Sequence, residues 1–204
     1  GVNPVRIGRH MCGTGHPVYV AFEIGGTMRG LHDALELAKI AGRAGAQALK
    51  AQLIDPARLV GIDAPVTFRD RTGERQASMR ALLAARALAP EAWAEVAQAV
   101  CAAGLDLIAT VDFPHTLDLA VKLGAVALKV CSGDVGYVAW IGHVAQAGLP
   151  VILDTGNATL GDIERAVEAV LAHEDRLVLH HVASGYPAHL ASTHLRMVTS
   201  LRQV

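Results

Sequence analysis

The sequence lacks the features that mark several large classes of protein. No apolar run approaches the roughly 18 residues that a membrane span requires, and the chain carries a formal charge of -1 without a basic cluster. Neither a membrane nor nucleic acid is therefore an expected partner. Nothing at the amino terminus resembles a signal peptide, and the three cysteines (Cys12, Cys101 and Cys131) show no metal-ligand spacing. We expect a cytoplasmic protein whose thiols are free.

Lysine is also scarce, with four residues against fourteen arginines. Two of the four stand near the ends of apolar runs, Lys50 in AQALKAQ (residues 46–52) and Lys129 in AVALKV (residues 125–130). Each run follows a helix-like segment and is typical of a buried strand. Because a buried ammonium group is costly unless an anion or a carboxylate meets it, we predict a site that holds an anion between these two lysines.

These residues also have a purely structural interpretation. A strand-end lysine is commonly paired with a nearby carboxylate, and Glu23 or Asp134 would serve. Ser132 follows the strand of Lys129 and could cap a helix, a role that is compatible with phosphate binding because helix amino ends also bind anions. The residues by themselves leave both interpretations open.

Strand-like and helix-like segments alternate along the chain. The predicted strands cover residues 18–26, 46–52, 106–111, 125–131, 150–154 and 176–182, and the predicted helices cover residues 31–44, 90–104, 116–123, 135–147, 155–173 and 193–202. Residues 54–76 are polar and contain two prolines, so we predict a long irregular connection there. The alternation indicates an α/β fold, a parallel sheet covered by helices.

Two architectures fit this alternation, an open doubly wound sheet and a TIM-type (β/α)8 barrel of which six βα units are visible. An open sheet often carries a GxGxxG loop after its first strand, and this chain has none there. We therefore predict the barrel, in which the carboxyl ends of all strands face one mouth. The polar residues expected at that mouth are Glu23, Lys50, Thr110, Lys129, Ser132, Asp154 and Ser184.

The ordered set of motifs resembles the sialic acid synthase (N-acetylneuraminate synthase) family. The matching segments are HPVYVAFEIG (16–25), AGAQALKAQ (44–52), GLDLIAT (104–110), ALKVCSGD (127–134), GLPVILDTGNATLGDIERAV (148–167) and HVASGYP (181–187). No single segment is decisive. Together they run through almost the whole chain at family-like spacing.

The resemblance implies a reaction, a fold and a set of site residues. Such synthases condense phosphoenolpyruvate with an aldose or amino sugar on a TIM-type barrel, giving a nonulosonic 2-keto acid and phosphate. Glu23 and Asp134 are implied as catalytic carboxylates. The implied substrate-binding residues are Lys50, Gln52, Thr110, Lys129, Ser132, Asp154, Ser184 and Tyr186. A divalent metal (Mn or Mg), with histidine ligands outside this chain, is expected as cofactor, and a homodimer is the expected assembly.

The chain departs from the family pattern at three places. Thr27 and Met28 stand where the family usually has Asn and His, and Asp154 stands where it has serine. The chain also stops at Val204 after six strands, whereas family members continue with two more strands and a small antifreeze-like domain. Because a parallel sheet with two open edges is a liability in solution, we interpret residues 1–204 as one barrel synthase domain that is incomplete at its carboxyl end.

Two other functions remain open from the sequence. A Schiff-base aldolase would use Lys50 or Lys129 as a nucleophile made reactive by its cationic neighbour. A catalytically inert barrel that binds a sugar acid or a partner subunit would explain Thr27, Met28 and Asp154. His180 and His181 invite a metal site, but adjacent strand residues point to opposite faces, so we do not expect them to bind one ion together.

Overall fold

The computed structural model describes residues 3–70, 73–183 and 188–204. The chain divides into two compact units. The first unit consists of Gly1–Val20, Ile108–Thr110 and Ala125–Val204, and the second of Ala21–Leu107 and Val111–Gly124. Among the residues described, no helix is long and apolar enough to cross a membrane.

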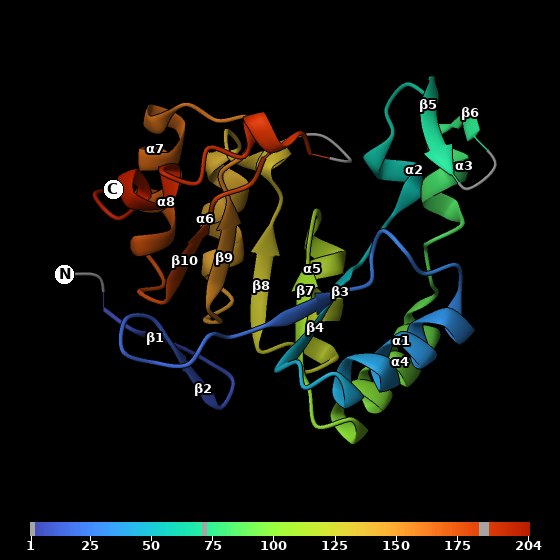
Figure 1. Cartoon of the computed structure of the whole chain (residues 1–204), viewed down its shortest axis with the longest axis horizontal. Helices are drawn as coiled ribbons and strands as arrows, with labels where there is room; N and C mark the ends of the chain where they lie inside the picture. Colours follow the sequence, from blue (N-terminus) through green and yellow to red (C-terminus); the bar gives the residue numbers. More distant parts are fainter. Residues whose placement is uncertain (1–2, 71–72, 184–187) are drawn as a thin grey trace. The chain divides into compact units, whose positions relative to one another are not determined.

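The main sheet has six strands whose order in space follows their order in the chain (Figure 1). They are β3 (Ala21–Glu23), β4 (Ala48–Gln52), β7 (Asp106–Thr110), β8 (Ala127–Val130), β9 (Val151–Asp154) and β10 (Leu177–His180). The pairs β3–β4, β7–β8, β8–β9 and β9–β10 are parallel. A doubly wound sheet reverses its strand order at a switch point, and this sheet does not. The sequence-based prediction of six consecutive strands of the barrel type is therefore confirmed.

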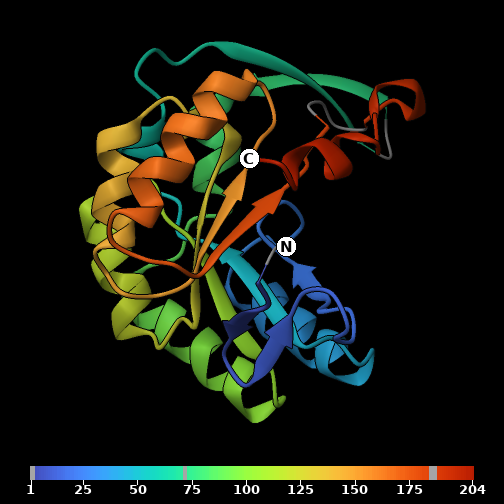
Figure 2. The same ribbon diagram turned by 90° about the vertical axis from the view of Figure 1, so that its left-hand side faces the viewer.

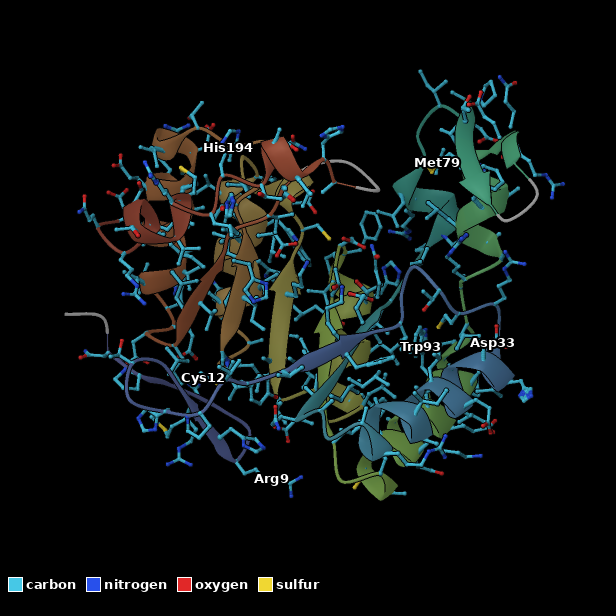
Figure 3. The ribbon with its side chains drawn as sticks, viewed as in Figure 1. Arg9, Cys12, Asp33, Met79, Trp93 and His194 are labelled. Atoms are coloured by element: carbon cyan, nitrogen blue, oxygen red, sulfur yellow. The ribbon has the colours of Figure 1, made fainter. Side chains whose placement is uncertain are left out.

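In the second unit, α1 (Leu31–Arg43) packs against α4 (Pro90–Ala102). Small residues of α1 and larger residues of α4 supply the buried faces of these helices: Ala34, Ala38 and Ala41 from α1, and Trp93, Val96 and Val100 from α4. Figure 3 shows the side chain of Trp93 on α4, which is only 2% exposed. The shorter helix α5 (Pro114–Lys122) follows β7.

The prediction of an irregular connection over residues 54–76 is wrong. This segment holds the short helix α2 (Pro56–Leu59) and an antiparallel hairpin of β5 (Pro65–Asp70) and β6 (Gly73–Ser78), followed by α3 (Met79–Ala84). The half-buried residues Val66 and Phe68 alternate with polar ones, a strand pattern that the neighbouring charges conceal. Gly73 has a φ of 120°, a conformation that favours glycine at this position.

The first unit begins with a second antiparallel hairpin, β1 (Val5–Ile7) and β2 (His10–Cys12). All residues of β8 and β9 are buried, as expected for strands covered on both faces. The helices α6 (Val138–Ala145) and α7 (Leu160–Leu171) pack against each other beside these strands (Figure 2). The chain ends with the short helices η2 (Leu190–Ser192) and α8 (Met197–Leu201).

Candidate functional site

Three charged or titratable side chains meet at the carboxyl ends of β8, β9 and β10 in the first unit. Lys129 lies opposite Ile152, and His180 lies opposite Asp154, so Lys129, Asp154 and His180 share one face of the sheet. The Lys129 ammonium donates a hydrogen bond to Oδ2 of Asp154. Nδ1 of His180 lies 3.3 Å from Oδ1 of the same carboxylate. Lys129 and Asp154 are only 8% and 7% exposed, so they form a buried ion pair.

The surroundings of Asp154 keep its carboxyl group ionised. Burial by itself raises the pKa of Asp154, but the His180 ring and the Lys129 ammonium outweigh burial and hold the pKa below its ordinary value. The sequence suggested Glu23 or Asp134 as structural partners for the lysines. For Lys129 the partner that the structure reveals is Asp154, the residue that departs from the family pattern.

Thr110 lies directly opposite Lys129 at the end of β7. It is fully buried, and within the described part of the chain its hydroxyl oxygen has no hydrogen-bond partner. A buried hydroxyl without a partner costs free energy. The hydroxyl is therefore a donor or acceptor that a ligand at this strand end can satisfy.

Asp134 ends the short helix η1 (Ser132–Asp134), which follows β8. Its carboxyl group is half-buried and makes no hydrogen bond or ion pair with any residue that the structure describes. Burial raises the pKa of Asp134. A carboxyl group with a raised pKa is better suited to exchange a proton near neutral pH than an ordinary one.

These opposite pKa directions predict opposite effects of pH on folding. The folded pKa of Asp154 is lowered, so its stabilisation is present above the unfolded value of about 3.9 and is lost as pH falls through the folded pKa. The folded pKa of Asp134 is raised, so its ionisation destabilises the fold as pH rises from the unfolded pKa through the folded pKa.

We expect Asp134→Asn to be more stable than the wild type in urea unfolding at pH 7, and the difference to vanish near pH 3. A pH-independent difference would contradict this.

The second unit holds the other lysine of interest. Glu23 on β3 lies directly opposite Lys50 on β4, and the two side chains form an ion pair. The backbone N–H of Gly25 donates a 2.5 Å hydrogen bond to Oε1 of Glu23. The side chain of Lys50 is 13% exposed and that of Glu23 is 47% exposed. Here the partner that the sequence suggested, Glu23, is the one observed.

Gly25 makes room for the Glu23 carboxylate. A Cβ atom at position 25 would lie 2.8 Å from Oε1 of Glu23 and 3.2 Å from Cβ of Gln52. We expect Gly25→Ala to push the carboxylate away, break its hydrogen bond and lower the free energy of unfolding by about 1 kcal/mol. Gly26→Ala is the matched control, because no atom lies within 4 Å of its added Cβ. Equal unfolding free energies for the two variants, measured in urea, would contradict the prediction.

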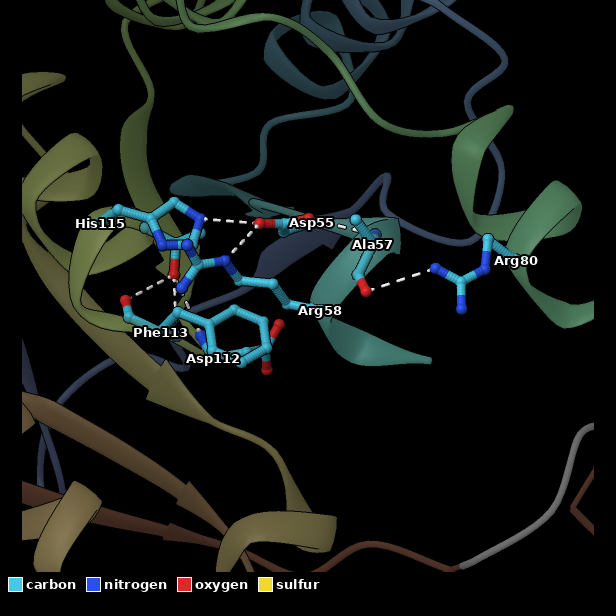
Figure 4. Close-up of polar contacts among 8 residues, drawn as sticks. Asp55, Ala57, Arg58, Arg80, Asp112, Phe113 and His115 are labelled. Atoms are coloured by element: carbon cyan, nitrogen blue, oxygen red, sulfur yellow. Dashed lines mark hydrogen bonds and ion pairs between the residues drawn. The ribbon is translucent and has the colours of Figure 1, made fainter. Parts of the chain in front are cut away.

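A further cluster in the second unit was not foreseen from the sequence. Oδ1 of Asp55 accepts a 3.1 Å hydrogen bond from the Ala57 N–H at the start of α2, and Oδ2 lies 3.1 Å from Nε2 of His115 and 3.5 Å from Nε of Arg58 (Figure 4). The His115 ring stacks on Phe113 with 5.7 Å between ring centroids. The Asp-Pro dipeptide could have revealed the helix cap. The contact with His115 depends on tertiary structure.

The remaining predicted residues are placed as follows. Gln52 ends β4, and Ser132 begins η1. Ser184 and Tyr186 lie outside the described residues. His180 contacts Asp154, while Nε2 of His181 lies 2.6 Å from the carbonyl oxygen of Thr193, so the two histidines have separate partners. The one sequence signal for His180 was its place in the predicted strand 176–182, which follows the predicted strand that ends in Asp154.

A metal site is not formed by the residues that the structure describes. Among them, no three His, Cys, Asp or Glu side chains come together as a group that could hold an ion. The family resemblance implies that the ligands of its metal lie outside this chain, so the described residues are not the ones expected to bind it.

Parallel strands whose carboxyl ends carry paired charges and a buried hydroxyl are typical of barrel proteins with a polar site at the strand ends. The family is shown directly: a model of the NeuB family matches residues 37–204, and the chain belongs to that family. The resemblance to sialic acid synthases that the motifs indicated is confirmed at family level.

The individual matches are more distant. The chain is 26% identical over 202 residues to an uncharacterized protein of Methanocaldococcus jannaschii, covering 98% of this chain and 56% of that protein. It is also 26% identical over 174 residues to the N,N'-diacetyllegionaminic acid synthase of Legionella pneumophila, covering 82% of this chain and 49% of that enzyme. The chain thus spans about half the length of the curated relatives it matches.

Solved structures support the fold. The N-acetylneuraminic acid (sialic acid) synthetase of Leptospira borgpetersenii matches with a TM-score of 0.84 and 22% identity, covering 98% of this chain and 66% of that one. The phospho-2-dehydro-3-deoxyheptonate aldolase (DAHP synthase) of Thermotoga maritima matches with a TM-score of 0.65 and 12% identity, covering 87% of this chain and 45% of that one. Together with the strand order, these matches confirm the predicted TIM-type fold class.

Proposed function

We propose that the chain carries the phosphoenolpyruvate-binding βα units of a sugar-acid synthase. In this reaction C3 of phosphoenolpyruvate attacks the aldehyde of an aldose or amino sugar, water adds at C2, and phosphate leaves to give a nonulosonic 2-keto acid. Membership of the NeuB family and the similarity to a legionaminic acid synthase support the reaction class. The substrates, the homodimer and the metal remain predictions for this chain.

The observation that carries the proposal is the pairing of Thr110 with Lys129. A buried ammonium group beside an unsatisfied buried hydroxyl matches the needs of an anionic oxygen, which accepts hydrogen bonds from both. Lys50 is the other substrate-binding lysine that the family resemblance implies. Preorganised donors of this kind stabilise developing negative charge without covalent chemistry.

The remaining residues take the roles that the family resemblance implies. Asp134, with its raised pKa, and Glu23 would exchange protons or contact the sugar. Ser132 would add a hydroxyl beside Lys129, and Gln52 would contact the sugar. Ser184 and Tyr186 complete the set of residues that would contact the substrates, while Asp154 would lie beside the bound anion as the partner of Lys129.

Thr110→Val tests the proposal because it removes the hydroxyl while keeping the shape of the side chain. We expect phosphoenolpyruvate affinity, measured by calorimetry, to fall about tenfold, since a hydrogen bond to a charged group is worth about 1.5 kcal/mol or more. Stability should stay equal or rise, because the unsatisfied hydroxyl is gone. A stable variant that binds phosphoenolpyruvate as tightly as the wild type would refute the role of Thr110.

The ion pair of Lys129 argues against the Schiff-base alternative. An amine must be neutral to attack a carbonyl, and the Asp154 carboxylate favours the charged ammonium form. Borohydride trapping with pyruvate separates the two, because only the aldolase forms an imine. An inert binding barrel would instead retain ligand binding without phosphate release from phosphoenolpyruvate and any candidate sugar.

A further inference from the structure

Asp154 lies between Lys129 on one neighbouring strand and His180 on the other, and of these two it is hydrogen-bonded only to Lys129. Oδ2 accepts the hydrogen bond of Lys129, while Oδ1 has no hydrogen-bond partner among the residues that the structure describes. His180 approaches Oδ1 to 3.3 Å from the other side, an ion-pair distance without the alignment of a hydrogen bond. Among the described residues, Lys129 on β8 and His180 on β10 are the titratable groups that act on this carboxylate.

An anion that binds Lys129 competes with Asp154 for the same ammonium group. Lys129 and Asp154 are both about nine-tenths buried. If Lys129 turns toward an incoming anion, Asp154 remains as a buried carboxylate beside added negative charge, which is strongly unfavourable unless another cation compensates. Binding therefore requires a replacement partner for Asp154 or a proton.

His180 is placed to be that replacement. Its side chain is half exposed, so the ring can take a proton from solvent. Its backbone is held beside Asp154, because both the N–H and the hydroxyl of Thr155 donate to the His180 carbonyl oxygen at 3.0 and 2.9 Å. Nδ1 lies 3.3 Å from Oδ1, so the distance already allows a hydrogen bond once the ring is aligned with this oxygen.

We propose that His180 is a positioning residue. When an anion binds Lys129, His180 accepts a proton and replaces Lys129 as the hydrogen-bonded partner of Asp154. Anion binding at the end of β8 is then coupled to proton uptake, because His180 gains a positive charge when the anion binds. The inference rests on the proposed function in one respect, since it takes phosphoenolpyruvate as the anion.

The first experiment needs no ligand. The titration of the His180 ring is followed by NMR, with its signals assigned as those missing in His180→Gln. In Lys129→Met, Asp154 loses its hydrogen-bonded cation and His180 becomes its one remaining partner among the described residues, so the ring should titrate at a higher pH by about one unit. In Asp154→Asn it should titrate at a lower pH. Lys129→Gln replaces Lys129→Met if the methionine variant does not fold. An unchanged His180 titration in the lysine variant overturns the inference.

The second experiment measures protons directly. Phosphoenolpyruvate binding is measured by calorimetry near pH 8 in two buffers of different ionisation enthalpy, where phosphate esters and histidines in water are largely deprotonated. The wild type should take up about one proton per ligand bound. Asp154→Ser, which needs no replacement cation, should take up almost none. Binding by the wild type without proton uptake also overturns the inference.

A double-mutant cycle separates this role from direct ligand contact. His180→Gln should weaken phosphoenolpyruvate binding about tenfold in the wild type and leave it unchanged in Asp154→Ser. Equal weakening in both backgrounds would mean that His180 contacts the ligand itself and would overturn the proposal. If no variant binds phosphoenolpyruvate, the proposed function fails, and the ligand-free titration still decides whether His180 and Asp154 are coupled.

Discussion

Lys129→Met is expected to lower the free energy of unfolding by about 3 kcal/mol at neutral pH and to abolish phosphoenolpyruvate binding. Methionine fills the space of the lysine stem but leaves Asp154 as a buried carboxylate whose hydrogen-bonded cation is gone. Of the described residues, the half-exposed His180 is the remaining partner that can offset this charge. Urea unfolding measures the stability, and calorimetry with phosphoenolpyruvate measures the binding.

The double variant Lys129→Met/Asp154→Leu serves as the control. It removes both charges, and an apolar pair of similar volume is commonly as stable as a buried ion pair. We expect it to recover most of the lost unfolding free energy while still failing to bind phosphoenolpyruvate. A single variant that is as stable as the wild type would mean that the ion pair contributes nothing, and retained binding would remove Lys129 from the site.

Asp154→Ser is expected to tighten phosphoenolpyruvate binding at least about tenfold. A carboxylate about 4 Å from a bound phosphate repels it by on the order of 4 kcal/mol per unit charge at an effective dielectric constant near 20. Repulsion of that size would weaken binding by roughly a thousandfold, and proton uptake reduces it. Serine removes the charge and releases Lys129 from its ion pair.

The same variant should be less stable than the wild type without ligand, because Lys129 becomes a buried ammonium group without its carboxylate partner. Phosphoenolpyruvate should therefore raise its melting temperature more than that of the wild type. Asp118→Ser is the matched control, since it removes the same charge from an exposed position on α5. Equal or weaker binding by Asp154→Ser at one salt concentration would mean that Asp154 points away from the anion or serves the ligand directly.

The sequence was sufficient to predict the fold class and the strand ends at which polar residues lie. Local patterns determine these features: apolar runs alternate with helical segments, and the polar residues that end each run must lie at the strand ends. The strands ending in Glu23, Lys50, Thr110, Lys129 and Asp154 were located in this way, and the register confirms that Lys50 faces Glu23 and that Lys129 faces Thr110. The family followed from the ordered motifs.

Which charges pair with one another was decided only by the tertiary structure. An ion pair depends on the distance and direction of side chains from different strands, which neither periodicity nor spacing encodes. Asp154 reaches Lys129 across the β8–β9 pair, and His180 approaches the same carboxylate from β10. The stacked His115 and the Asp55 carboxylate also come from segments far apart in the chain. The hairpin of β5 and β6 was missed for a local reason, since neighbouring charges conceal the alternation of the half-buried Val66 and Phe68 with polar residues.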